Sequence, residues 1–146
     1  MLSTFRKYKK SQVYFGVATR DGFGGTKGNI VEIPAIWCDV DYKDIARKQL
    51  AELYRGFPFK PTIIIKSGGG VHFYWCLSEP VGQNEISLDE DVNKRIAFAL
   101  GGDFKACNAA TVLRPPGTYN NKPEYDPPHS GNDRDKSIRI RAWSVH

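Results

Sequence analysis

The sequence predicts an α+β domain in which a mainly antiparallel sheet is covered by helices. Segments rich in β-branched and aromatic residues alternate with two segments of helical periodicity, and short turn-forming joins connect neighbouring strands. The resulting order, β-β-α-β-β-α-β with hairpins, is typical of α+β folds. The 146 residues contain no internal repeat and no linker, so we expect residues 1–146 to form a single domain.

Composition and charge indicate a globular domain with a polyanionic partner. Hydrophobic residues make up 40% of the chain and charged residues 25%. No apolar run approaches the roughly 18 residues of a membrane span, and no apolar secretory core follows the basic N-terminus, so we expect neither membrane contact nor a signal peptide. The net charge of +5 favours a nucleic acid as partner. Three widely spaced cysteines without a CxxC pair are typical of a reducing cytoplasm.

The strands are expected from β-branched and aromatic segments that end at turn residues. They are residues 12–19, 30–40, 62–66, 71–77 and 137–143, with a short strand-like run at 111–114. The four glycines of residues 20–29 indicate a plain hairpin connection or a mobile nucleic-acid contact. In the strand 71–77, alternation places His72 and Tyr74 on one face and Val71 and Phe73 on the other. The polar, proline-rich residues 120–136 indicate a loop.

Two helices are expected from apolar residues that recur near the helical period. The first spans residues 44–55, with Ala46, Leu50, Leu53 and Phe57 on its buried side. The second opens with a capping box, Ser87-x-x-Glu90, and ends at Gly101-Gly102. Its expected buried side consists of Val92, Ile96 and Leu100.

The stretch that ends the strand 30–40 carries the first candidate site. Asp39 and Asp41 are one residue apart, so on a strand their side chains share a face. Two adjacent carboxylates resist joint ionisation unless a cation lies between them, and oxygen ligands of this kind suit divalent metal. The alternative is a strand that runs out into solvent, where aspartate is common in turns.

The second candidate site lies in the join between the strands 62–66 and 71–77. Lys66 and Ser67 precede three glycines, whose backbone N–H groups, including those of Gly69 and Gly70, are able to converge on an anion. Ser67 adds a hydroxyl donor and His72 a second donor across the turn. The alternative is a flexible hairpin turn with a packed histidine.

The third candidate site follows the second helix. Asp103 is followed by Arg114, Asn120 and Lys122, which offer one acid, two fixed cations and an amide. Such a set is able to complete a metal site and to grip a triphosphate or a template. The alternatives are a helix-terminating turn for Asp103 and a surface ion pair for Arg114.

The order of these three motifs resembles that of the archaeo-eukaryotic primase superfamily. Asp-x-Asp at a strand end, Ser-Gly-x-Gly-x-His in a hairpin and Asp…Leu-Arg-x-Pro-Gly-Thr-x-Asn-x-Lys are similar to the primase-polymerase domains of plasmid and phage replication proteins, the RepB-type primases. The resemblance runs from Val13 to the final strand. It implies an RRM-like sheet with an additional small α/β lobe, and a longer parent protein with a C-terminal helical domain and a helicase.

The resemblance also implies roles for the motif residues. Asp39, Asp41 and Asp103 match the metal ligands for two Mg²⁺ or Mn²⁺ ions, and Ser67 and His72 match the residues that hold the phosphates of a nucleoside triphosphate (dNTP or NTP). The basic segment Arg114, Asn120 and Lys122 would contact the nucleotide or the template. The implied activity is that of a DNA primase-polymerase. It makes or extends primers on single-stranded DNA by template-dependent nucleotidyl transfer, with release of pyrophosphate.

Three residues depart from the family pattern. Pro115 stands where relatives carry an aliphatic residue, and Asn108 and Thr111 stand where the RepB-type group often has Asp and Arg. If Asn108 rather than Asp103 held the ligand position, the metal site would lack its third carboxylate and the enzyme would be impaired. The spacing to Leu113-Arg114 favours Asp103.

Two other classes of protein, a rolling-circle initiator nuclease and a non-catalytic nucleic-acid-binding module, share some of these sequence features. A rolling-circle initiator nuclease needs two histidines that flank one hydrophobic residue, and His72 is followed by Phe73-Tyr74 without a second histidine. A non-catalytic module that binds single-stranded nucleic acid would share the basic charge and the aromatic residues. It would have no use for three acids among basic residues.

Overall fold

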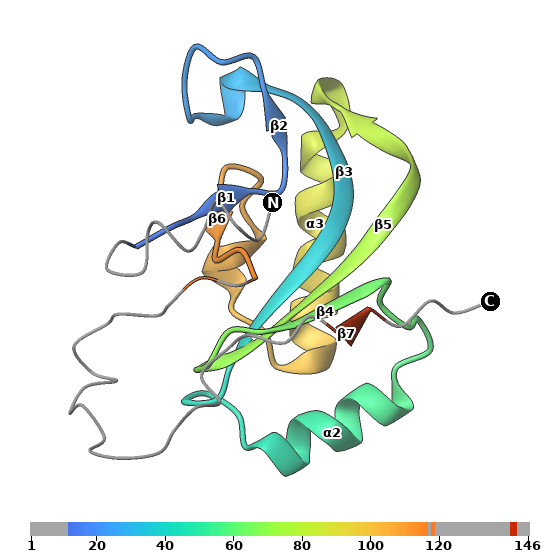
Figure 1. The fold of residues 1–146 in the computed structure, drawn as a ribbon. Helices are drawn as coiled ribbons and strands as arrows, with labels where there is room; N and C mark the ends of the chain where they lie inside the picture. Colours follow the sequence, from blue (N-terminus) through green and yellow to red (C-terminus); the bar gives the residue numbers. More distant parts are fainter. Residues whose placement is uncertain (1–11, 117, 119–140, 143–146) are drawn as a thin grey trace.

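The computed structural model describes residues 12–116, residue 118 and the backbone of residues 141–142. Within these residues the chain forms an α+β fold with antiparallel sheets and two helices, as predicted (Figure 1). The helices are α2 (Arg47–Gly56) and α3 (Ile86–Leu100), and short 3-10 turns form η2 (Lys27–Asn29), η3 (Gln83–Glu85) and η4 (Phe104–Cys107). The strands are β1 (Phe15–Gly16), β2 (Thr19–Arg20), β3 (Ile30–Asp41), β4 (Ile63–Lys66), β5 (Gly70–Gly82), β6 (Val112–Leu113) and β7 (Arg141–Ala142).

The larger sheet has the strand order β2-β3-β5-β4-β7, and β1 pairs separately with β6. Strands β3 and β4 are both antiparallel to β5 and lie on its two sides, so they run parallel to each other. Helix α2 connects them across β5, which makes a split β-α-β unit. The predicted hairpin of β4 and β5 is confirmed, and β5 continues to Gly82, beyond the predicted end at residue 77.

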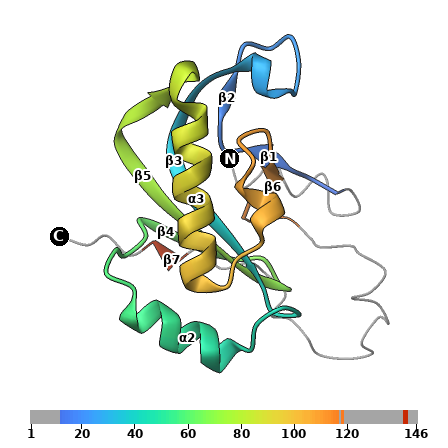
Figure 2. The ribbon, with the colours of Figure 1, turned by 180° about the vertical axis from the view of Figure 1, so that it is seen from behind.

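Both helices cover the same face of the larger sheet. Viewed from behind, α3 lies in front of β3, and α2 lies below α3 (Figure 2). Leu50 and Tyr54 of α2 pack on the same side as α3, with Tyr54 stacked on Phe73. Because strand residues alternate between faces, Cys38 and Val40 at the end of β3 and Val71, Phe73 and Trp75 at the start of β5 point to the helices. The core on this side contains Cys38, Val40, Ile45, Leu50, Val71, Phe73, Ala97, Leu100 and Cys107.

The other face of the sheet packs against the β1–β6 pair and the segment before β6. Phe15 of β1 lies against Tyr74 of β5, with ring centroids 6.3 Å apart. The core on this side contains Val17, Ala18, Ile30, Ile33, Ala35, Trp37, Ile65, Tyr74, Ala109 and Leu113. Polypeptide therefore packs on both faces of the larger sheet: the two helices on one face, and the β1–β6 pair with the segment before β6 on the other.

One edge of β3 is paired with β5. The other edge pairs with β2 at Ile30 and Glu32, and further along it bonds to α3 and to the segment after α3. The backbone N–H of Trp37 donates to Asn93 Oδ1 of α3 at 3.0 Å, and Asn93 Nδ2 donates to Asp89 Oδ2 at 3.0 Å. Further along the same edge, the N–H of Asp103 donates to the carbonyl oxygen of Asp39 at 2.8 Å. Because buried backbone groups need partners, these bonds explain why the buried stripe of α3 contains two polar residues.

The helix predictions need correction at the start and the buried side of α2 and at the start of α3. Helix α2 begins at Arg47 rather than at residue 44, and Leu53 is 37% exposed while the ring of Tyr54 stacks on Phe73. The capping box at Ser87 is wrong, because η3 precedes the helix and makes Glu85 its N-cap.

The buried stripe of α3 is also shifted from the predicted one. It consists of Asp89, Asn93, Ala97 and Leu100, whereas Val92 and Ile96 are only partly buried. Glu90, the other half of the predicted capping box, instead accepts the N–H of Ala109 at 2.9 Å and pairs with Lys27 at 2.6 Å. The side chain thus ties α3 to the segment before β6.

The predicted strand 12–19 is wrong as a single strand. It divides into β1 and β2, which bend apart at Val17-Ala18 and join different sheets. The glycine-rich segment that follows is braced by Asp21, whose carboxylate accepts from the Phe23 N–H and from Asn29 Nδ2. Of the predicted strand 137–143, only residues 141–142 are described, and they pair with β4. The loop predicted at 120–136 lies outside the described residues.

Candidate active site

The two aspartates of β3 lie on the sheet face that carries the β1–β6 pair. Their side chains are partly buried, with 28% of Asp39 and 24% of Asp41 exposed. Asp41 Oδ2 lies 3.2 Å from Lys43 Nζ, and Oδ1 accepts the Lys43 N–H at 3.3 Å. The carbonyl oxygen of Asp41 accepts from Asp44 and Ile45, which turns the chain out of the strand. The pair is held at the end of a buried strand.

His72 lies directly opposite Asp39 in the register of β3 and β5. Its Nε2 is 3.4 Å from Asp39 Oδ1, and its Nδ1 is 3.4 Å from the hydroxyl of Tyr74. Burial of the ring, and secondarily the positive charge of Arg114, lower the pKa of His72 to about 4. The imidazole is therefore neutral at pH 7, and its contact with Asp39 is that of a neutral ring with a carboxylate.

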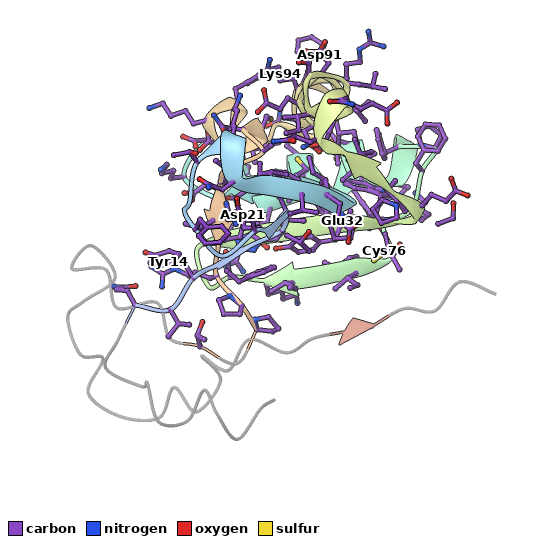
Figure 3. All side chains as sticks on the ribbon, turned by 90° about the horizontal axis from the view of Figure 1, so that it is seen from above. Tyr14, Asp21, Glu32, Cys76, Asp91 and Lys94 are labelled. Carbon is purple, nitrogen blue, oxygen red and sulfur yellow. The ribbon has the colours of Figure 1, made fainter. Side chains whose placement is uncertain are left out.

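Arg114 follows β6 and brings a buried positive charge toward this histidine. Only 6% of the residue is exposed. Its guanidinium donates to the hydroxyl of Tyr14 at 3.0 Å and lies 4.9 Å from the centroid of the same ring. Figure 3 shows Tyr14 on the side of β3 and β5 away from Asp91 and Lys94 of α3. The cationic side of the site thus comes from the β1–β6 pair and the acidic side from β3.

The glycine turn between β4 and β5 packs against the end of β3. The N–H of Ser67 donates to the carbonyl oxygen of Gly70 at 3.0 Å, and the N–H of Tyr42 donates to that of Gly69 at 2.9 Å. Gly68 has a φ of +88°, which favours glycine, and a Cβ on Gly70 would collide with the carbonyl oxygen of Val40. Two of the three glycines are thus required by the backbone itself, and the turn lies beside Asp41.

Asp103 comes close to Asp39 through its backbone, while its carboxylate points elsewhere. Helix α3 ends at Gly101, with a φ of +71°, and the chain then hydrogen-bonds to the open edge of β3 at Asp103. The Asp103 carboxylate accepts the N–H of Lys105 at 2.8 Å and caps η4. The three predicted acids are therefore neighbours in the fold, but only Asp39 and Asp41 present carboxylates on the same face of β3.

The residues that depart from the primase pattern have local structural roles. Asn108 Oδ1 accepts the N–H of Ala110 at 2.8 Å, and the carbonyl oxygen of Asn108 accepts the N–H of Thr111. Asn108 thus shapes the turn before β6, whereas Asp103 bonds to the backbone of Asp39. The carbonyl oxygen of Pro115 accepts from the hydroxyl of Thr118 at 2.8 Å.

The acidic residues at the end of β3 fit part of a divalent metal site. Among residues 12–116 and 118, no group of three or more histidine, cysteine, aspartate or glutamate side chains is arranged to hold an ion. Asp39 and Asp41 supply the hard oxygen ligands that Mg²⁺ and Mn²⁺ prefer, and so fit part of such a site. The Asp103 carboxylate, which accepts the N–H of Lys105 through Oδ1, is the candidate for a third protein ligand. The predicted Asn120 and Lys122 lie outside the described residues.

Two contacts made by tyrosines of this site are not predicted by the sequence: that of Tyr74 with His72 and that of Tyr14 with Arg114, although Tyr14 is a candidate for stacking on a single-stranded template. Tyr74 contacts His72, and its position two residues further along the same strand already placed it on the same face. Tyr14 contacts Arg114 across 100 residues of sequence, through the pairing of two very short strands. Nothing local in the sequence predicts that second contact.

Comparison with known proteins shows the fold but not the family. No protein-family model and no curated protein matches the sequence. Among solved structures, the chain is similar to the AEP (archaeo-eukaryotic primase) domain of the primase-polymerase of cyanophage S-2L, with a TM-score of 0.59 and 21% sequence identity. The match covers 81% of this chain and 62% of that one. The expected α+β fold is thus confirmed, and it is similar to that of this phage domain. In the described part of the chain, neither helix combines the length and the apolar composition needed to cross a membrane.

Proposed function

We propose that this domain is a template-dependent nucleotidyltransferase, a DNA primase-polymerase of the RepB type. The observation that carries the proposal is the contact of Asp39 with His72 across β3 and β5, beside the glycine turn. In this arrangement carboxylates for a metal adjoin donors for a phosphate, in a fold similar to that of a phage primase-polymerase domain. The split β-α-β unit supports an RRM-like core, with β1 and β6 as part of the additional lobe.

The acidic side would hold the metal. Asp39 and Asp41 would be the principal ligands of Mg²⁺ or Mn²⁺, and Asp103, which accepts the N–H of Lys105 through Oδ1, is the candidate for a third. When bound, such ions stabilise the charge that develops on the attacking and leaving oxygens of phosphoryl transfer. Lys43 lies 3.2 Å from Asp41 and would have to yield to a cation at that carboxylate.

The cationic side would hold the triphosphate. His72 of β5 is neutral at pH 7 and offers an N–H donor. Arg114, which follows β6, offers a fixed positive charge. Ser67, Gly69 and Gly70 lie in the turn between β4 and β5 and would add backbone or hydroxyl donors. These groups orient the nucleotide and neutralise its charge. Lys66, Asn120 and Lys122 are proposed as further contacts.

Helix α2 offers a surface for the DNA strand. Arg47, Lys48 and Arg55 are exposed, and they lie within about 100° of one another around the helix axis. Lys43, just before the helix, extends this basic flank to Asp41. Single-stranded DNA binds positively charged surfaces through its phosphates. We therefore assign the template or primer backbone to this flank, on the helix-covered side of the sheet.

The proposed role includes partners outside the domain. A C-terminal helical domain and a helicase would complete the replication protein, and residues 1–146 would be its catalytic domain. Priming requires that two nucleotides be bound at once, and a helical domain would supply the second nucleotide-binding site.

Metal-dependent nucleotide binding tests the proposal. Free Mn²⁺ is measured by electron paramagnetic resonance during titration, with and without dATP, for the wild type, Asp39→Asn and Asp41→Asn. We expect the wild type to bind Mn²⁺ more tightly with dATP, and both variants to lose this gain. If all three proteins bind DNA equally and none binds Mn²⁺ or dATP, the result would favour the alternative, a non-catalytic module for single-stranded nucleic acid.

A further inference from the structure

We propose that Tyr74 is a positioning residue that makes His72 an Nε2–H donor toward Asp39 and the phosphates of the bound nucleotide. The inference rests on the proposed function, because it assigns Tyr74 a part in nucleotide binding. It adds a residue that belongs to none of the three motifs.

The geometry of β5 places the two side chains together. His72 and Tyr74 are two residues apart, so both point to the face that carries Asp39. The Tyr74 hydroxyl lies 3.4 Å from His72 Nδ1, and the two rings meet edge to face with centroids 6.3 Å apart. Only 4% of His72 and 5% of Tyr74 are exposed, and Phe15 packs on the tyrosine ring. Neither side chain is able to turn to solvent for another partner.

The chemistry of the two groups decides which nitrogen of the imidazole carries the hydrogen. The Tyr74 hydroxyl is able to donate to Nδ1 or to accept from it, and the Asp39 carboxylate opposite Nε2 favours the tautomer in which Tyr74 donates. A neutral imidazole has one donor and one acceptor nitrogen. When Tyr74 donates to Nδ1, the hydrogen must be on Nε2, the atom 3.4 Å from Asp39 Oδ1. The opposite tautomer would set the Nε2 lone pair against a carboxylate.

This assignment has a direct consequence for nucleotide binding. Phosphate oxygens are acceptors, so the site needs an N–H at Nε2 and not a lone pair. Tyr74 provides that N–H without charging the ring. Loss of the hydroxyl leaves Nδ1 without its donor and allows the tautomer that repels both the carboxylate and the phosphate.

The first test is the ¹⁵N spectrum of the imidazole rings at neutral pH. The chain has three histidines, and the signals of His72 are assigned by their loss in His72→Leu. We expect a protonated Nε2 and a hydrogen-bonded Nδ1 in the wild type, and an Nδ1 shift of several ppm toward the free lone pair in Tyr74→Phe. Tyr54→Phe is the matched control, because its ring stacks on Phe73 of the same strand from the helix side. A proton on Nδ1 in the wild type, or unchanged shifts in Tyr74→Phe, would overturn the inference.

The second test is a double-mutant cycle on the dissociation constant of dATP in Mg²⁺ buffer. We expect Tyr74→Phe to raise Kd about fivefold, which corresponds to about 1 kcal/mol, the net value of one hydrogen bond. In the His72→Leu background the same substitution should change nothing, since Tyr74 acts through the histidine. Equal effects in both backgrounds, or no effect in the wild type, would contradict the positioning role. Absence of dATP binding by the wild type would refute the proposed function instead, and the ¹⁵N spectrum would still test the contact.

Discussion

The buried histidine of the candidate site makes the stability of the protein depend on pH in a defined direction. His72 has a pKa of about 4 in the folded chain, against 6.5 for the exposed side chain. Between these values the unfolded chain binds a proton that the folded chain does not, so acidification favours unfolding. The stabilisation is complete above about pH 6.5 and is lost as the pH falls to about 4. A depression of about 2.5 pKa units is worth about 3 kcal/mol, since each unit is 1.36 kcal/mol.

Urea unfolding at several pH values between 7.5 and 4 measures this loss, with EDTA present to exclude metal. We expect the free energy of unfolding of the wild type to fall by about 3 kcal/mol more than that of His72→Leu over this range. Arg114→Gln should reduce the difference, because the guanidinium is the second cause of the depressed pKa. Parallel pH profiles for the wild type and His72→Leu would refute the assignment of a buried, neutral histidine.

Two further predictions concern the edge of β3 and the basic flank of α2. Asn93→Leu should lower the free energy of unfolding by about 2–4 kcal/mol, because it leaves a buried backbone N–H and Asp89 without partners; a loss below 1 kcal/mol in urea unfolding would contradict this. Reversal of Lys48 and Arg55 to Glu should weaken binding of an oligo(dT) and reduce the slope of log K against log salt by about 1–1.5. The same reversal of Lys94 and Arg95 on α3 is the control, and an equal effect there would speak against α2.

The sheet was largely predictable because its signals are local. The β4–β5 hairpin follows from two β-branched segments around a glycine turn, and β3 follows from its apolar run into Asp39. The acids and the glycine turn were also recognisable, because they occur in sequence order at strand ends. These residues carry their signal in their immediate neighbours.

The rest depends on tertiary contacts that no local pattern carries. The buried stripe of α3 was misplaced because hydrophobic periodicity selects apolar residues, whereas Asn93 is buried to satisfy an edge of β3. The uniform composition of the segment 12–19 predicts one strand, yet β1 pairs with β6. That pairing is also what brings Arg114 to Tyr14. The capped carboxylate of Asp103 likewise becomes visible only when η4 is seen.

Primer extension tests the proposed activity most directly. A labelled primer on a single-stranded DNA template is incubated with Mn²⁺ and dNTPs, and the wild type is compared with Asp41→Asn. Asp44→Asn is the matched control, an exposed acid three residues further on whose backbone N–H bonds to Asp41. We predict extension by the wild type and by Asp44→Asn, and a loss of about a thousandfold or more in Asp41→Asn, as expected when a metal ligand is removed. Extension by Asp41→Asn at the wild-type rate would contradict the assignment of the acidic pair as the catalytic centre.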